Sequence, residues 1–234
     1  MSAGSILSAL EDVQIAPRRS LAEEAADKLR EAILLEHLAP GTPVPERELS
    51  EAMGISRTPL KDALRLLEME GLIDYGPTRR PRVANPSLDT LRDNITVLGA
   101  LEALAGELAC AVATEKELSR IAALARDMEV DGGDTLSFFH QDMAFHGAIV
   151  AAARNAPLAE THRQYNARLW RARFLSSRQI DRRENTLAEH DRIVTALMAR
   201  DGAATANAMR AHLRSTIENI ARVDADVRTK RDEH

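Results

Sequence analysis

Residues 45–83 place two short helical patterns ahead of two strand-like segments, and this order constrains the fold more than any other feature of the chain. Gly54 ends the first pattern and Gly71 ends the second, because glycine readily adopts the left-handed conformation that closes a helix. Ser56 is the expected N-cap of the second helix, whose aliphatic residues recur at helical spacing. The order helix, turn, helix, strand, strand predicts a winged helix-turn-helix.

The second helix carries a basic row opposite its apolar row. Arg57, Lys61 and Arg65 follow one another every four residues and therefore share one face. A DNA-recognition helix needs such a face, since its apolar side packs on the preceding helix while its outer side enters the major groove. Most basic triplets are solvated helix surfaces, so this row alone is weak evidence.

A basic wing makes the prediction of DNA binding more specific. Segments 72–75 and 82–84 have strand-like composition and enclose a proline-bounded turn, in which Arg79 and Arg80 can reach phosphates or the minor groove. The net charge of the chain is -5, so DNA affinity must come from this local basic patch. We expect a homodimer that binds an inverted repeat in double-stranded DNA, with one recognition helix per half-site.

The remainder of the chain predicts a second, all-α domain. A chain of 234 residues has room for two domains. No strand alternation follows the wing, so the predicted fold is mainly α, with a flexible extension at 1–17, a winged helix-turn-helix with a small β wing at 18–85, and a helical bundle at 86–228. Glycine, aspartate and proline breaks divide the bundle into helices near 88–113, 116–129, 134–153, 156–177, 180–200 and 203–227.

One aspartate and three histidines of the bundle have spacings that suit a metal site. Asp142 and His146 are four residues apart and share a helix face. His190 and His212 lie eleven residues before and after Asp201, so both are expected ~16 Å from the turn of an antiparallel hairpin. These ligands indicate zinc first, with nickel, manganese or iron as alternatives. The other histidines are expected to be ordinary surface or hydrogen-bonded residues.

Residues 18–84 resemble the DNA-binding domain of GntR-type bacterial transcription regulators. The resemblance is carried by LAPG at 38–41, EREL at 46–49, SRTP at 56–59 and LEMEGLI at 67–73. It implies DNA contacts by Arg47, Arg57, Thr58 and Lys61, to which the residue pattern adds Ser56, Arg65, Arg79 and Arg80. The family usually has arginine at position 61, where lysine cannot make the same planar contact with guanine. It also usually has glycine near the wing tip.

Residues 88–225 resemble the FCD domain, the effector-binding helical bundle of the FadR branch of GntR regulators. The pattern is visible as DxxFHxxI at 142–149, NxPL at 155–158, EH at 189–190 and HL at 212–213. In that branch an aspartate and three histidines bind a divalent metal, which implies Asp142, His146, His190 and His212 as the ligands. Many members bind small carboxylates in the same cavity, which implies a small-molecule effector of this class.

The usual carboxylate clamp of the family is missing. Members often have an arginine a few residues before a Leu-Glu pair on the first bundle helix, whereas the four residues before Leu101-Glu102 are uncharged here. Arg168, Arg171 and Arg173 are candidate replacements, although arginines on an amphipathic helix commonly face solvent.

These features predict a ligand-responsive transcription regulator in the cytoplasm, with repression the more frequent outcome in the family. The alternative is a metal-dependent hydrolase-like or metal-sensing protein with an appended DNA-binding module. The regulator is favoured because no acidic residue stands out as a general base beside the metal motif and no nucleophile motif is present. The single cysteine suits a reducing compartment. We expect neither a signal sequence nor a membrane span, because we see no basic region before the first apolar run and no apolar run of ~20 residues.

Overall fold

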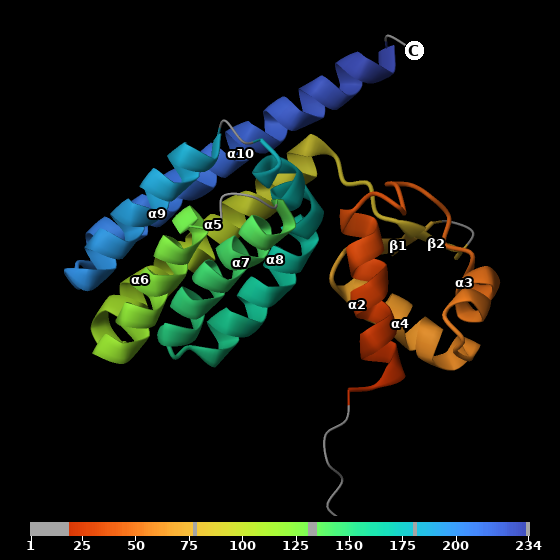
Figure 1. The fold of residues 1–234 in the computed structure, drawn as a ribbon, viewed down its shortest axis with the longest axis horizontal. Coiled ribbons are helices and arrows are strands. Elements are labelled where there is room, and N and C mark those ends of the chain that lie inside the picture. Colours follow the sequence, from red (N-terminus) through yellow and green to blue (C-terminus); the bar gives the residue numbers. More distant parts are fainter. Residues whose placement is uncertain (1–18, 77–78, 131–134, 180–181, 233–234) are drawn as a thin grey trace, which may run out of the picture.

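The computed structural model describes residues 19–76, 79–130, 135–179 and 182–232. The extension predicted at 1–17 lies outside these ranges. Figure 1 shows a winged helix-turn-helix followed by a longer helical bundle, which confirms the predicted fold class. In chain order the elements are α2 Leu21–Leu34, α3 Glu46–Ala52, α4 Arg57–Met69, β1 Ile73–Tyr75, β2 Pro81–Val83, α5 Leu88–Val112, α6 Glu115–Val130, α7 Thr135–Ala152, α8 Ala156–Ser177, α9 Arg183–Met198 and α10 Gly202–Asp232.

Local sequence explains the helix ends of the winged helix-turn-helix. Ser20 and Glu23 form a capping box at the start of α2, which satisfies backbone N–H groups that a helix N-terminus leaves without a partner. Gly54 (φ 64°) follows α3 and Gly71 (φ 70°) follows α4, as predicted. The apolar row of α4, including Leu64, is buried against α2 and the strands in one core.

The wing is a two-stranded antiparallel sheet in the described part of the chain. β1 pairs with β2 in the register Ile73↔Val83. β1 begins one residue later than predicted, and β2 lies one residue earlier than predicted. Val44 N–H donates to the Pro81 carbonyl at 2.9 Å, and the chain before α3 thereby runs beside β2. Positions 77 and 78 of the predicted turn lie outside the described residues. Arg79 has φ 53°, a conformation that glycine adopts without strain, which explains why glycine is usual near this position.

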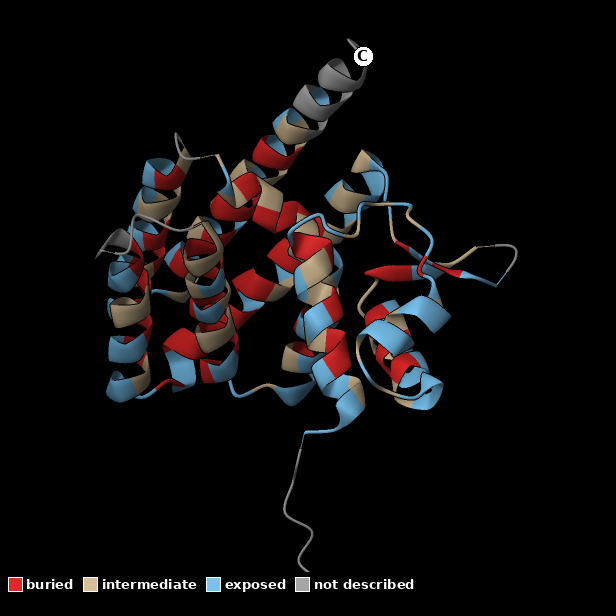
Figure 2. Ribbon diagram, turned by 45° about the vertical axis from the view of Figure 1, so that its right-hand side comes forward, coloured by how far each residue is buried: buried red, intermediate tan, exposed pale blue. Residues whose placement is uncertain are grey.

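Six helices among the described residues form the bundle. α10 packs along α5, which also contacts α7 and α8, while α6 contacts α7 and α9. Buried residues, red in Figure 2, concentrate where these helices face one another. Each predicted bundle helix is present. The predicted start of α9 at 180 lies outside the described residues, and α10 continues to Asp232 rather than ending at 227.

Helix α5 corrects one expectation about apolar segments. Among the described residues it is the one helix that is long and apolar enough to cross a membrane by length and composition, whereas the sequence pattern predicted no such segment. Half of its apolar window is buried inside the protein. Its small residues allow α10 to pack closely, since a Cβ at Gly106 would lie 2.6 Å from Thr205 Cγ2. The apolar composition of α5 is therefore that of a helix packed in the centre of the bundle.

The winged helix-turn-helix contacts the bundle through α2 and α8. Leu34, at the end of α2, packs with Phe139 and Phe174 of the bundle in one buried apolar cluster. Beside this cluster, Arg171 Nη2 donates to Glu36 Oε1 at 2.7 Å. Helix α8 therefore carries both an apolar and an ionic contact to the DNA-binding part of the chain.

Candidate metal centre and nucleic-acid interface

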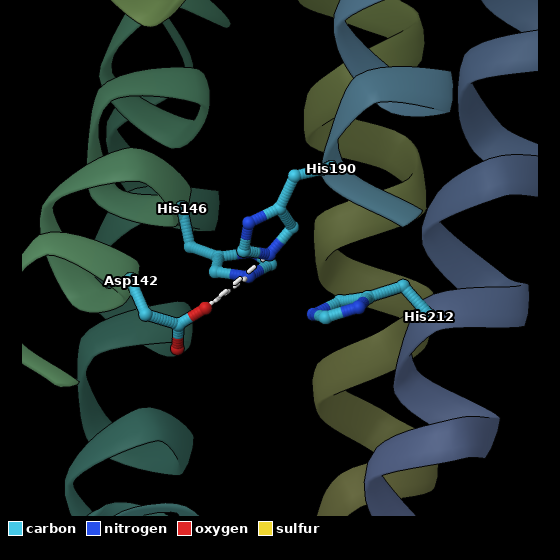
Figure 3. Close-up of side chains that lie close together, drawn as sticks. All are labelled: Asp142, His146, His190 and His212. Carbon is cyan, nitrogen blue, oxygen red and sulfur yellow. Dashed lines mark ion pairs between the residues drawn. The ribbon is translucent and has the colours of Figure 1, made fainter. Parts of the chain in front are cut away.

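The four side chains predicted as metal ligands converge inside the bundle (Figure 3). Helix α7 supplies Asp142 and His146 from successive turns, α9 supplies His190, and α10 supplies His212. The ring centroids of His190 and His212 are 4.8 Å apart, as their equal distance from the α9–α10 turn predicts. All four residues are buried, and one ligand atom from each lies within 4.8 Å of the others.

This arrangement fits a divalent metal ion. Two ligands on opposite sides of an ion with ~2.1 Å bonds are ~4.2 Å apart, so shifts of less than ~1 Å would bring all four atoms to bonding distance. Asp142 Oδ1 lies 3.5 Å from His146 Nε2 and 3.3 Å from His190 Nε2. Both ring nitrogens of His190 are buried and form no hydrogen bond of normal geometry with any described residue. Such burial is costly unless a ligand such as a metal ion accepts the nitrogen lone pair.

Two carboxylates that are not among the predicted metal-site residues lie behind the histidines. Glu102 on α5 is 0% exposed, and its Oε2 lies 2.7 Å from His146 Nδ1. Its Oε1 lies 3.1 Å from Nε2 of the buried His162, and Glu189 Oε2 lies 2.8 Å from His212 Nδ1. The sequence prediction beside the metal motif concerns only a general base and assigns neither carboxylate to the site. The signal for Glu189 was its place directly before a predicted ligand, whereas Glu102 is hidden in an apolar helix.

Arg173 is the candidate effector arginine that the structure brings to this cluster. Its Nη2 donates to Asp142 Oδ2 at 3.1 Å and its Nη1 donates to Asn166 Oδ1 at 2.9 Å. Nη1 also lies 3.6 Å from Glu102 Oε1. Arg173 is 4% exposed, so these acceptors compensate a charge held inside the bundle. A cavity of about 40 Å³ borders Asp142, Arg173 and His212.

The other two candidate arginines face the winged helix-turn-helix instead. Arg171 pairs with Glu36 after α2. Arg168 lies over the Tyr165 ring, 5.3 Å from its centroid, and its Cγ would be 2.7 Å from a Cβ at Gly71. Both side chains thus lie at the contact between the two parts of the chain, and we do not retain them as effector ligands.

The pKa values of the cluster are shifted in opposite directions. Burial alone would lower the pKa of His146, but the negative charges of Glu102 and Asp142 outweigh burial and raise it to about 9. Burial lowers the pKa of His190 to about 4, and the nearby carboxylate of Asp142 offsets this only in part. Burial would raise the pKa of Asp142, but Arg173 and the histidines hold it well below its usual range. The lowered pKa of His190 favours the neutral form that binds a metal, whereas His146 would have to release a proton when it binds one.

The predicted recognition helix presents its basic row to solvent. Arg57, Thr58 and Lys61 are exposed on the first two turns of α4. Arg65 is exposed one turn later, where its Nη1 lies 3.3 Å from Asp62 Oδ1. The opposite face of the helix is buried in the domain core. An exposed polar face on a helix anchored in this way is available to the major groove.

Ser56 corrects a prediction about how this helix begins. It occupies the N-cap position of α4, but its side chain makes no cap hydrogen bond, so its expected role as a hydroxyl cap is wrong. Ser56 is exposed at the N-terminus of α4, and helix N-termini favour anions such as phosphate. Arg47 on α3 and the wing residues Arg79 and Arg80 are also exposed. The predicted DNA-contacting side chains are thus accessible on α3, α4 and the wing.

Known protein families match both parts of the chain. Residues 93–215 match the model of the FCD domain, and residues 21–83 match that of the bacterial regulatory proteins of the gntR family. The FCD match alone covers more than half of the 234 residues. The chain belongs to the GntR family.

Relatives of this GntR protein are named as transcription regulators. An uncharacterized HTH-type transcriptional regulator in an unstable DNA locus of Streptomyces ambofaciens is 32% identical over 206 residues, covering 85% of this chain and 84% of that protein. The HTH-type transcriptional repressor RspR of Escherichia coli K12 is 27% identical over 214 residues, covering 91% and 94%. The solved structure of E. coli McbR/YncC shares the fold, with a TM-score of 0.76 at 20% identity over 88% of this chain and 99% of that one.

These matches decide between the predicted classes of function. The GntR chain is a DNA-binding transcription regulator, and the hydrolase-like alternative is overturned because both the families and the relatives are regulators. Its bundle is the FCD domain, the part of such regulators that responds to small molecules. The buried Asp-His cluster lies within this domain.

Proposed function

We propose that this GntR protein is a homodimeric, cytoplasmic repressor whose bundle holds a divalent metal ion and binds a small carboxylate beside it. The observation that carries the proposal is the buried cluster of Asp142, His146, His190 and His212, with Arg173 at its edge. The ion, zinc first and otherwise nickel, manganese or iron, would supply a fixed positive charge to an effector oxygen. Repression is proposed because the relative RspR is named a repressor.

The charges beside the cluster support a carboxylate as the effector. Arg173 is a buried cation whose planar group can contact a carboxylate through two N–H bonds. The Arg173 guanidinium contacts both Asp142 and Glu102, so an incoming anion would compete with one of these carboxylates for it. The adjoining cavity of about 40 Å³ has room for only a few water molecules and therefore favours a small acid.

Helix α8 supports a route from this site to the winged helix-turn-helix. Arg173 and Phe174 are neighbours on α8, and Phe174 packs with Leu34 of α2. Arg171 of the same helix pairs with Glu36. A ligand that moves Arg173 would act on the helix that contacts the DNA-binding part, and a shift of that part changes the spacing of two recognition helices in a dimer.

Operator contact is proposed for α4 and the wing. Arg57, Thr58 and Lys61 would meet bases in the major groove, whereas Arg79 and Arg80 would meet phosphates or the minor groove. The remaining proposed contacts are Arg47, Ser56 and Arg65. Each of these side chains is exposed, which supports the assignment.

An apolar row on α5 supports the homodimer. Val97, Leu104 and Val112 are large hydrophobic residues that are exposed along this helix. Single exposed hydrophobic residues are ordinary, but several along one helix favour burial against a second copy of the chain. Two copies would also present two recognition helices to an inverted repeat.

Operator binding with and without metal and acids tests the proposal. Small mono- and dicarboxylic acids that stabilise the zinc-loaded protein in a thermal-shift screen would be added to anisotropy titrations with an operator selected from random duplexes. The expected result is that an acid weakens operator binding by zinc-loaded protein and has no effect after chelation. A response to zinc alone, unchanged by every acid, would instead favour a metal sensor.

A further inference from the structure

Two carboxylates behind the proposed metal site each face the Nδ1 atom of a proposed histidine ligand. Glu102 on α5 and Glu189 on α9 each place Oε2 near the Nδ1 atom of a proposed ligand, at 2.7 Å from His146 and 2.8 Å from His212. Glu102 is fully buried and the Glu189 side chain is 15% exposed. A carboxylate in such a place is costly unless a donor or a positive charge compensates it. His146 compensates Glu102 together with His162 and Arg173, and His212 compensates Glu189.

This relation selects the ring nitrogen that each histidine offers to a metal. A histidine ligand binds through one nitrogen and carries its proton on the other, and a hydrogen bond from the protonated nitrogen fixes the choice. His212 Nδ1 is hydrogen-bonded to Glu189, and His146 Nδ1 forms a close ion pair with Glu102. In the metal-bound form of each histidine the proton would remain on Nδ1, facing its carboxylate, and the lone pair would be on Nε2. For His146, Nε2 is also the atom that faces Asp142. His190 differs, since no ion pair joins its Nδ1 to a carboxylate of the described residues, and its Nε2 is the atom that faces Asp142.

Building on the proposed metal site, we propose that Glu102 and Glu189 are positioning residues that fix the ring orientation and proton of His146 and His212 and thereby set the metal affinity. Glu102 also contacts the side of the cluster where the effector is proposed, because its Oε1 lies 3.6 Å from Arg173 Nη1. The same buried carboxylate thus orients a metal ligand and helps to hold the arginine. Loss of the Glu102 charge should therefore weaken metal binding first.

Amide variants with matched controls test this role. Glu102→Gln and Glu189→Gln preserve side-chain size and remove the charged acceptor, whereas Glu107→Gln and Glu184→Gln make the same change at exposed positions on α5 and α9. Zinc affinity would be measured by competition with a chromophoric chelator. We expect a loss of ~10–100-fold for each buried variant and no change for either control. The visible spectrum of the cobalt-loaded protein should also change in the buried variants alone, since it reports the ligand field.

Thermal midpoints in excess chelator separate metal binding from simple stabilisation of the bundle. Equal zinc affinity in the wild type, Glu102→Gln and Glu189→Gln would overturn the inference, even if the midpoints of the metal-free variants fall. A wild-type protein that binds no zinc would overturn the proposed metal site itself, which is a different result. If Glu102→Gln does not fold, Glu189→Gln, at a position nearer the surface, decides the question.

Discussion

We expect single side chains at the start of α4 to determine how this regulator contacts DNA. Arg57 is the first residue of the helix and is exposed, which is where recognition helices contact base edges. Arg57→Ala should weaken binding to the specific operator by ~1–3 kcal/mol and relax the preference at one base pair. Anisotropy titrations with the operator and with a scrambled duplex would measure both effects. Unchanged operator affinity would contradict recognition through α4.

The wing contains a second residue whose backbone and charge can be tested separately. Arg79 has φ 53°, which costs a residue with a side chain ~1–2 kcal/mol, so the strain relieved in Arg79→Gly should offset the greater entropy of an unfolded glycine. Chemical denaturation should therefore show no loss of stability. The slope of log affinity against log salt should fall by ~1, because one phosphate contact is lost.

Arg80→Gly is the matched control, because Arg80 has no positive φ and glycine there should lower stability by ~0.5–1 kcal/mol. A clear destabilisation by Arg79→Gly, equal to that of the control, would show that the left-handed conformation carries no strain. If the slope of log affinity against log salt stays unchanged in both variants, Arg79 and Arg80 do not contact phosphates.

Helices and strands were predictable where local sequence decides them. The capping box of α2, the glycine ends of α3 and α4 and the periodicity of the bundle are properties of neighbouring residues. Even the approach of His190 to His212 follows from equal spacing about one turn. The place of Glu102 could not be predicted, since it depends on how α5 packs against α7 and α8. The same is true of Arg173, whose periodicity is that of any amphipathic helix.

The contact between α2 and α8 yields a prediction about signal transmission. Glu36→Gln should weaken the pair with Arg171 and reduce the change in operator affinity caused by an effector, while metal content stays the same. Trp170 is the single tryptophan of the chain and lies 5.1 Å from the Phe139 ring at this contact, so its fluorescence should shift in the variant. Glu31→Gln, an exposed change on α2, is the control. A full effector response in Glu36→Gln would exclude this contact from the route.

The whole molecule is expected to function as a pair of chains. Leu104→Glu places a charge in the exposed apolar row of α5 and should convert the dimer to a monomer, because burial of an unpaired charge opposes association. Light scattering would measure the mass, and operator affinity should fall with it, since one recognition helix reads only one half-site. A dimer that persists in this variant would place the interface on another surface.

Metal content after dialysis tests the central proposal most directly. Wild-type protein should retain about one divalent ion per chain by elemental analysis, because four buried ligands from three helices converge on one point. The double variant His190→Ala and His212→Ala should retain almost none, and its bundle should be less stable while basal operator binding persists in the other part of the chain. Full occupancy in the double variant would show that these histidines are packing residues and would contradict a metal centre in the bundle.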